Sequence, residues 1–234
     1  MSDLAARIGA LDWARIGADL DAYGAAATGV LLTPAECAEL VAGYDVPAAF
    51  RSRVVMARHG FGRGEYQYFA HPLPEMVAIL RGTLYPPLAA IATGWAGRLG
   101  QPPFPTAHGD FLALCHAAGQ TRPTPLLLRY GPGDYNCLHQ DLYGAQAFPL
   151  QAAFLLSDPA AFTGGEFVLT EQRPRMQSRV EVVRLRQGEA VIFAVNERPA
   201  TGTRGVYRLR MRHGVSRLHA GRRHTLGVIF HDAA

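Results

Sequence analysis

The composition of the chain changes after Pro123, and this change constrains the fold more than any other feature. Short runs of Val, Leu, Ile and Phe are separated by Gly and Pro, a pattern typical of β-strands joined by turns. A jelly-roll (double-stranded β-helix) of two facing sheets needs about eight such strands, and one can come from the first half of the chain. The expected strands of the second half lie at residues 126–130, 151–157, 166–170, 180–185, 190–195, 207–215 and 225–230.

The first half of the chain has a helical pattern instead. Apolar residues recur at helical spacing over residues 3–23 and again over residues 74–98. The second pattern is the longest in the chain, and we expect it to be interrupted near Pro86 and Pro87 because proline lacks the backbone N–H that an inner helical turn needs. We therefore expect helices that cover the outer face of one sheet.

Two further elements are predicted in the first half from local signals. Thr33 is a good N-cap and Pro34 suits the first helical position, so a helix begins here. It should run to about Gly43, where the glycine supplies a stop. Residues 50–58 alternate partly between polar and apolar, which predicts the single strand that the first half contributes to the sheets.

These elements together predict an α+β fold in a single structural domain. Residues 1–119 would form a helical support region with one strand, and residues 120–234 would form the jelly-roll core. A chain of 234 residues is long enough to bury a sizeable core of this kind.

One pair of polar residues in the β-rich half has the spacing of metal ligands. His139 and Asp141 are separated by one residue, and in an extended strand alternate side chains point to the same face. A third ligand from a distant strand, His213, would complete a triangle. Two imidazoles and one carboxylate can cover one face of an octahedral Fe(II) and leave three positions open.

The motifs around these residues form an ordered set between Pro123 and His231. The set comprises Tyr130-x-x-Gly133, His139-x-Asp141, Gly164-Gly165-Glu166, Gly188-x-Ala190-x-x-Phe193, His213-x-Val215 and Gly221-x-Arg223. Together they resemble the Fe(II)- and 2-oxoglutarate-dependent oxygenases, and among these the prolyl-hydroxylase-like branch. The resemblance covers roughly the C-terminal half of the chain.

The resemblance implies a function and roles for particular residues. It implies Fe(II), 2-oxoglutarate and O₂ as cofactor and co-substrates, with iron bound by His139, Asp141 and His213. It implies that Arg223 pairs with the far carboxylate of 2-oxoglutarate, and that Tyr130 and Thr225 hydrogen-bond the same carboxylate. The reaction would be hydroxylation of an unactivated C–H bond with release of succinate and CO₂. No catalytic residue beyond the metal ligands is expected. The family often has proline four residues after the second histidine, whereas this chain has Arg217.

The substrate is less constrained than the metal site. The prolyl-hydroxylase-like pattern favours an amino acid, a peptide or a protein side chain. Oxidative demethylation of nucleic acid is the rival activity, suggested by 15 arginines against 9 acidic residues in residues 120–234. No stripe of interleaved aromatic and basic residues supports it, so a nucleic-acid partner is not expected. A non-catalytic jelly-roll that senses a metal or a small acid is the third possibility, and retention of every ligand argues against it.

A basic, glycine-rich segment of the first half is the candidate substrate entrance. Arg58, His59 and Arg63 surround flexible glycines at residues 60–64. Loops at the mouth of a rigid scaffold commonly carry specificity. The competing interpretation is an ordinary surface turn; a phosphate-binding loop is excluded because no helix-forming run follows. A serine hydrolase and a zinc metalloprotease are excluded in turn, because the G-x-S-x-G and H-E-x-x-H motifs do not occur.

The expected compartment and partners are inferred only from sequence signals that are missing. No apolar run approaches the length that spans a bilayer, and the N-terminus lacks a basic region followed by an apolar signal core. Three widely spaced cysteines argue against a disulfide framework. We therefore expect a cytoplasmic protein without a membrane partner, and the oligomeric state remains open.

Overall fold

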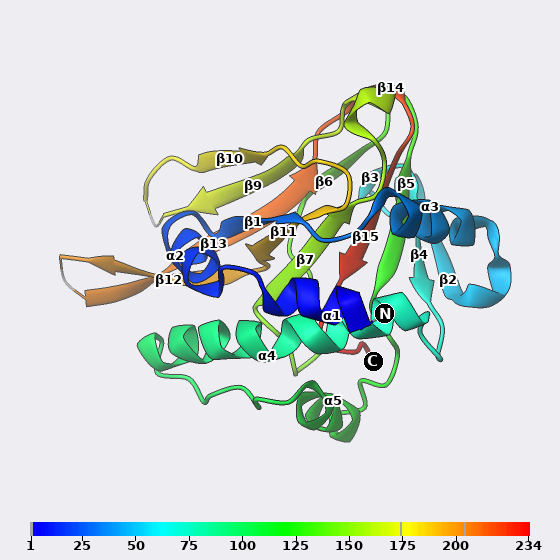
Figure 1. Cartoon of the computed structure of the whole chain (residues 1–234). Coiled ribbons are helices and arrows are strands. Elements are labelled where there is room, and N and C mark those ends of the chain that lie inside the picture. Colours follow the sequence, from blue (N-terminus) through cyan, green and yellow to red (C-terminus); the bar gives the residue numbers. More distant parts are fainter. Residues whose placement is uncertain (1, 174, 204) are drawn as a thin grey trace.

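Two large antiparallel sheets face each other, and helices lie along the outer side of one of them (Figure 1). The computed structural model describes residues 2–173, 175–203 and 205–234. The α-helices are α1 (Ser2–Gly9), α2 (Trp13–Tyr23), α3 (Pro34–Ala42), α4 (Glu75–Arg98) and α5 (His108–Ala117). Short 3-10 helices lie at Gly43–Asp45, Pro47–Ala49, Met56–Arg58 and Pro159–Ala161.

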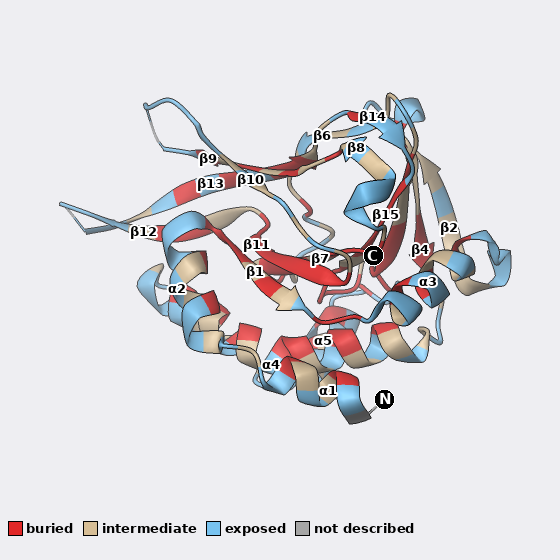
Figure 2. Ribbon diagram, turned by 45° about the horizontal axis from the view of Figure 1, so that its top comes forward, coloured by how far each residue is buried: buried red, intermediate tan, exposed pale blue. Residues whose placement is uncertain are grey.

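The larger sheet has seven strands in the order β1-β11-β7-β15-β5-β4-β2. Their bounds are β1 Ala25–Val30, β11 Glu189–Ala194, β7 Leu150–Leu155, β15 Arg223–Val228, β5 Leu126–Tyr130, β4 Glu65–Phe69 and β2 Phe50–Val55. Strand β11 is buried along its whole length, and β7 and β15 are buried at all but one position, because the sheet is covered on both faces (Figure 2).

The smaller sheet has the strand order β10-β9-β13-β6-β3, and β12 pairs with β13 beside this path. A separate two-stranded ladder joins β14 to β8. The bounds are β10 Arg179–Val183, β9 Phe167–Gln172, β13 Gly205–Val215, β6 Tyr135–His139, β3 Gly62–Arg63, β12 Glu197–Gly202, β14 Leu218–Gly221 and β8 Phe162–Gly164. All seven strands predicted in the second half are present, and two facing antiparallel sheets confirm the α+β jelly-roll fold.

The first half contributes more strands than the single one we expected. β1, β2 and β4 join the larger sheet and β3 joins the smaller one, so no sheet boundary separates residues 1–119 from residues 120–234. Strand β1 escaped prediction because half of its residues are alanine, which is depleted in strands. It is held by pairing with β11. Tertiary pairing therefore decides the state of this segment.

Helix α4 runs without interruption through Pro86 and Pro87, where we expected a break. Pro86 is exposed and Pro87 is half-buried, so both rings lie toward the outer side of the helix. On the inner side, Leu84, Tyr85 and Leu88 are fully buried. The apolar burial of that face outweighs the two backbone hydrogen bonds that the prolines cannot make.

Helix α4 also qualifies the expectation about membranes. By length and composition alone it could cross a bilayer, although 44% of its most apolar window is buried inside the fold. It packs against α1, α5 and β15, as the core helix of a folded domain does. Arg81 on its buried side forms an ion pair of 2.8 Å with Asp232, and this pair ties the helix to the C-terminal segment.

The remaining local predictions hold with shifted ends. The pattern over residues 3–23 forms two helices, because Asp12 accepts a hydrogen bond of 2.9 Å from Arg15 N and begins α2. Thr33 and Glu36 form the capping box of α3. Gly43 lies in the right-handed region with φ −65, so it leads into a 3-10 helix and is not a left-handed stop. The strand predicted over residues 50–58 ends at Val55, and a 3-10 helix follows.

Candidate metal centre

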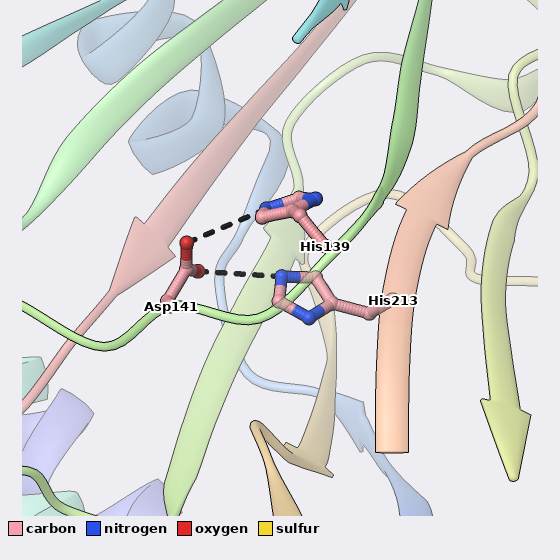
Figure 3. A group of neighbouring side chains, drawn as sticks. All are labelled: His139, Asp141 and His213. Carbon is pink, nitrogen blue, oxygen red and sulfur yellow. Dashed lines mark ion pairs between the residues drawn. The ribbon is translucent and has the colours of Figure 1, made fainter. Parts of the chain in front are cut away.

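The three predicted ligands come together at one end of the smaller sheet (Figure 3). His139 is the last residue of β6 and lies directly opposite His213 in the register of β6 and β13. Asp141 follows two residues after His139, beyond the end of the strand. Strand pairing thus places two imidazoles side by side, with ring centroids 4.2 Å apart, and the chain then turns to bring the carboxylate to them.

The geometry of these three side chains suits a single ion. One donor atom from each residue lies within 4.8 Å of the others. His139 Nε2 is 3.4 Å from Asp141 Oδ1, and His213 Nε2 is 3.3 Å from Asp141 Oδ2. Asp141 and His213 are buried, with 8% and 6% of their surface exposed. Two nitrogens and one carboxylate on one face, with the opposite side open to a cavity, match the donor set of a non-haem Fe(II) site.

The charges of the three residues depend on one another. Burial alone would raise the pKa of Asp141, but hydrogen bonds from His139 and His213 hold it well below its usual range. Burial opposes charge on His139, yet Asp141 raises the pKa of this imidazole. Burial dominates at His213 and lowers its pKa. Asp141 is therefore an anion, and it is the one ionised carboxylate of the triad.

The two histidines are oriented by different surroundings. His139 Nδ1 lies 2.8 Å from the carbonyl of Cys137, so a proton on Nδ1 leaves Nε2 free to face the site. The ring of His213 packs against Phe193, with centroids 4.5 Å apart, and stacks on Phe167 at 6.1 Å. These two aromatic rings form an apolar wall behind the ligand.

Gln140, between the first two ligands, links the ligand loop to the strand of the third. Its side-chain amide donates to Asn196 Oδ1 at 2.7 Å and to the carbonyl of Met211 at 2.8 Å. Met211 lies two residues before His213 on β13, on the same face of the strand. The amide therefore sets the distance between the His139–Asp141 loop and β13. No local pattern in the sequence predicts this role, because it depends on contacts more than 50 residues away.

The residues predicted to bind the far carboxylate of the co-substrate come from the larger sheet. Arg223 on β15 lies directly opposite Tyr130 on β5, and its guanidinium carbon is 5.6 Å from the centroid of the tyrosine ring. Thr225 lies two residues further along β15, on the same face. All three line one cavity of about 380 Å³ together with the three candidate metal ligands.

Arg223 has the surroundings of an anion-binding residue. It is 4% exposed, and its Nη1 atom has no hydrogen-bond partner in the part of the chain that the structure describes. Burial lowers the pKa of its guanidinium, because the charge has lost its hydration. A buried charge is costly unless an opposite charge joins it. The neighbouring Arg222, just before β15, is exposed. A dicarboxylate in the cavity would supply the missing anion at Arg223.

Three tyrosines form a cavity wall that the sequence did not predict. Tyr66 and Tyr68 lie two residues apart on β4, and Tyr143 follows Asp141 by two residues. Tyr66 and Tyr68 are edge to face at 5.4 Å, and Tyr68 and Tyr143 are edge to face at 6.4 Å. The spacing of Tyr66 and Tyr68 was a visible signal, but it has meaning only once β4 is known to be a strand.

The predicted substrate residues lie beside the cavity and not in its wall. Arg58, His59 and Arg63 are exposed, whereas Gly60 and Phe61 line the cavity. The ring of His59 stacks on Phe61 with centroids 5.3 Å apart. The segment therefore borders the cavity through Gly60 and Phe61, and its role as a substrate entrance stays a prediction.

Comparisons with known proteins agree with this geometry. A family model described as an oxygenase catalysing oxidative methylation of damaged DNA matches residues 64–233. Proteins from two strains of Mycobacterium tuberculosis, whose names assign no activity, are 49% identical over 168 residues, which is 71% of this chain and 72% of theirs. The residues that the family model matches include every candidate ligand and Arg223.

Solved structures with the same fold are remote in sequence. A 2-oxoglutarate–Fe(II) oxygenase family protein from Burkholderia pseudomallei has a TM-score of 0.56 at 16% identity, covering 95% of this chain and 92% of its own. A Trichoplax adhaerens prolyl hydroxylase, in complex with a hypoxia-inducible-factor peptide, has a TM-score of 0.57 at 14% identity, covering 97% and 91%. These likenesses confirm the fold.

The family match, the shared fold and the His-Asp-His group agree on the chemistry. An oxygenase with this fold and this His-Asp-His group implies Fe(II), 2-oxoglutarate and O₂. The chain belongs to the oxygenase family whose model is described as catalysing oxidative methylation of damaged DNA, and it has the fold of a 2-oxoglutarate–Fe(II) oxygenase family protein.

Proposed function

We propose that this oxygenase binds Fe(II) through His139, Asp141 and His213, anchors 2-oxoglutarate on Arg223, and oxidises a methylated base in damaged DNA. One observation carries the first two parts. The buried His-Asp-His face and the unpaired guanidinium of Arg223 open into the same cavity. A metal and a dicarboxylate that chelates it would satisfy both ends at once.

Fe(II) and 2-oxoglutarate, when bound, supply the oxidation: one oxygen atom of O₂ enters succinate, the other enters a substrate C–H bond, and CO₂ leaves. On a methyl group attached to nitrogen, the product is N–CH₂OH, which releases formaldehyde and restores N–H. The net balance is methylated base, O₂ and 2-oxoglutarate giving free base, formaldehyde, succinate and CO₂. Oxidation of this kind removes the methyl group.

The protein's own contribution is to position the reactants and to exclude water. Arg223, from the larger sheet, fixes the far end of the dicarboxylate, while His139 and His213, from the smaller sheet, fix the metal end. Phe167 and Phe193 shield the metal face from the interior side. The reaction needs no general base from the chain, and the proposal assigns none.

Two features support a base as the substrate. The family description names damaged DNA, and a flat ring extruded from a duplex is bound by stacking between aromatic side chains. The wall of Tyr66, Tyr68 and Tyr143 offers such surfaces beside the metal face. The net charge of +4 also suits a polyanion. The motif order alone had favoured an amino acid, peptide or protein side chain, so that substrate class remains the competitor in the test.

The test is a substrate panel with Fe(II), 2-oxoglutarate and O₂. Single-stranded oligonucleotides that carry one N-methylated base are compared with the unmodified oligonucleotides and with proline-containing peptides. We expect succinate and formaldehyde in equal amounts, and a mass loss of one methyl group, only with a methylated oligonucleotide. His213→Ala should abolish all of these products. Hydroxylated peptide without oligonucleotide turnover would overturn the DNA assignment and leave the oxygenase assignment standing.

A further inference from the structure

Asp141 has one hydrogen-bond partner that is not a candidate metal ligand. The hydroxyl of Tyr143 donates to Asp141 Oδ1 over 2.6 Å. Because the carboxylate is an anion, this hydrogen bond is charge-assisted and is among the stronger kinds in proteins.

The bond distinguishes the two oxygens of the carboxylate. Both oxygens face a ligand imidazole, Oδ1 at 3.4 Å from His139 Nε2 and Oδ2 at 3.3 Å from His213 Nε2. Only Oδ1 also accepts from a hydroxyl, that of Tyr143, among the residues that the structure describes. A carboxylate that occupies one position on an octahedral ion coordinates through one oxygen, and its other oxygen then requires a partner. Tyr143 occupies the place of that partner.

Tyr143 is itself held in place from three directions. Its ring meets Tyr68 edge to face at 6.4 Å and lies 6.0 Å from the ring of His231. The chain beyond it is clamped by the buried side chain of Gln120, which accepts from Gln146 N at 2.7 Å and donates to the carbonyl of Gln146 at 2.9 Å. A side chain fixed in this way can impose an orientation on the carboxylate.

The next residue in the chain shows how closely this clamp fits. Gly144 has a φ of +145, and a Cβ at this position would lie 2.3 Å from the side chain of Gln120. Only glycine accepts both the backbone conformation and the close approach. The backbone beyond Tyr143 is therefore shaped so that Gln120 can reach it.

The geometry points to Tyr143 as a positioning residue that holds the Asp141 carboxylate for metal binding. The inference rests on the proposed metal ligands. It also connects the two parts of the cavity, because Tyr143 belongs to the same wall as Tyr68 and Tyr66, where we place the substrate. A substrate that moves this wall would change the orientation of the Asp141 carboxylate through the hydroxyl of Tyr143.

The experiment measures metal affinity directly, with Co(II) under anaerobic conditions. The variants are Tyr143→Phe, which removes only the hydroxyl, Tyr68→Phe, which removes the hydroxyl of its neighbour, and Tyr135→Phe as control. Tyr135 is a half-exposed residue on the same strand as His139 and does not line the cavity. The dissociation constant, the visible Co(II) spectrum and the thermal midpoint of the metal-free protein are recorded for each.

We expect Tyr143→Phe to bind Co(II) roughly 10–100-fold more weakly, as is usual when an outer partner of a metal ligand is lost. Tyr68→Phe should show a smaller loss, and Tyr135→Phe none. With Fe(II), the apparent KM for the metal should rise. The ring is kept, so a merely space-filling tyrosine predicts an unchanged dissociation constant and spectrum, and that result would overturn the inference.

Two further outcomes keep the inference apart from the proposed function. If the wild-type protein binds no Co(II), the metal assignment itself fails, and the inference fails with it. If wild type binds but Tyr143→Phe does not fold, as its metal-free thermal midpoint will show, Tyr68→Phe decides: a weakened Co(II) constant supports the tyrosine contact, and a constant equal to that of Tyr135→Phe contradicts it.

Discussion

The two sheets of the molecule contribute opposite ends of one site. The smaller sheet supplies the imidazoles of His139 and His213, which would hold the metal, and the larger sheet supplies Arg223, Tyr130 and Thr225, which would hold the co-substrate. Each end is built by direct cross-strand pairing: His213 opposite His139, and Arg223 opposite Tyr130. The difference is in charge pairing: at the metal end Asp141 faces both histidines, whereas at the other end Arg223 forms no ion pair with any residue that the structure describes. Removing a charge should therefore have different consequences at the two ends.

The largest effect is expected at the metal end. Asp141→Ala removes the only anionic ligand, and the two histidines then face each other without a counter-charge. Fe(II) affinity should fall by more than the roughly 10–100-fold that an outer partner contributes, and turnover should be lost. Metal content after equilibrium dialysis, measured beside succinate release, tests this. Full iron occupancy and turnover in Asp141→Ala, His139→Ala and His213→Ala would remove these residues from the metal site.

At the arginine end, the effect should fall on the co-substrate and spare the metal. Arg223→Met leaves a buried carboxylate of 2-oxoglutarate unpaired, which costs about 2–5 kcal/mol, or roughly 30-fold or more in the apparent KM. Arg223→Lys should lose less, since it keeps the charge without the planar fork. Co(II) affinity should stay unchanged in both. Arg222→Met is the matched control on the exposed face, and a larger KM effect there than at Arg223 would show that the register of β15 is wrong.

A smaller effect is expected where the ligand loop meets β13. Gln140→Leu leaves Asn196 Oδ1 and the carbonyl of Met211 without their donor. An unpaired buried acceptor costs about 1–3 kcal/mol, so the free energy of unfolding should fall by about that amount. Metal affinity should fall less than in Asp141→Ala. Gln177→Leu, in the exposed loop between β9 and β10, controls for loss of an amide. Equal urea midpoints for the two variants would show that the amide does not join the loop to the strand.

The smallest effect is expected outside the cavity. Arg58→Ala and Arg63→Ala change exposed residues next to Phe61, so they should reduce substrate oxidation and leave substrate-independent decarboxylation of 2-oxoglutarate intact. The ratio of oxidised substrate to succinate measures this coupling. Unaltered coupling in both variants would identify the segment as an ordinary surface turn.

The features that could be predicted from the sequence depend on residues that are close together in the chain. The features that were missed depend on residues that are far apart. His139 and Asp141 are close together in the sequence, although Asp141 reaches the site through a turn beyond the end of β6 and not by strand alternation. Arg223 and Thr225 share one face of β15, as the period of a strand requires. The capping box at Thr33 is local as well. These features agree with the structure, and their functional roles remain to be tested.

The features that escaped prediction depend on partners far away in the chain. Strand β1 is alanine-rich and becomes a strand only by pairing with β11, more than 150 residues later. The tyrosine wall needs β4 to lie beside β5, and Gln140 needs Asn196 and Met211. Pro86 and Pro87 in α4 show the opposite case, in which a strong local signal is overridden by burial of the inner helical face. Local patterns therefore predicted the metal end better than the substrate side.

The central claim is that one cavity holds a metal and a dicarboxylate at its two ends. Anaerobic calorimetric titration of 2-oxoglutarate into the wild-type protein, with and without Fe(II), tests it most directly. We predict one 2-oxoglutarate per chain, bound much more tightly when Fe(II) is present, with this gain lost in Asp141→Ala and binding weakened in Arg223→Met even with metal. Equal binding of 2-oxoglutarate with and without Fe(II), or binding that is unchanged in Arg223→Met, would contradict the claim.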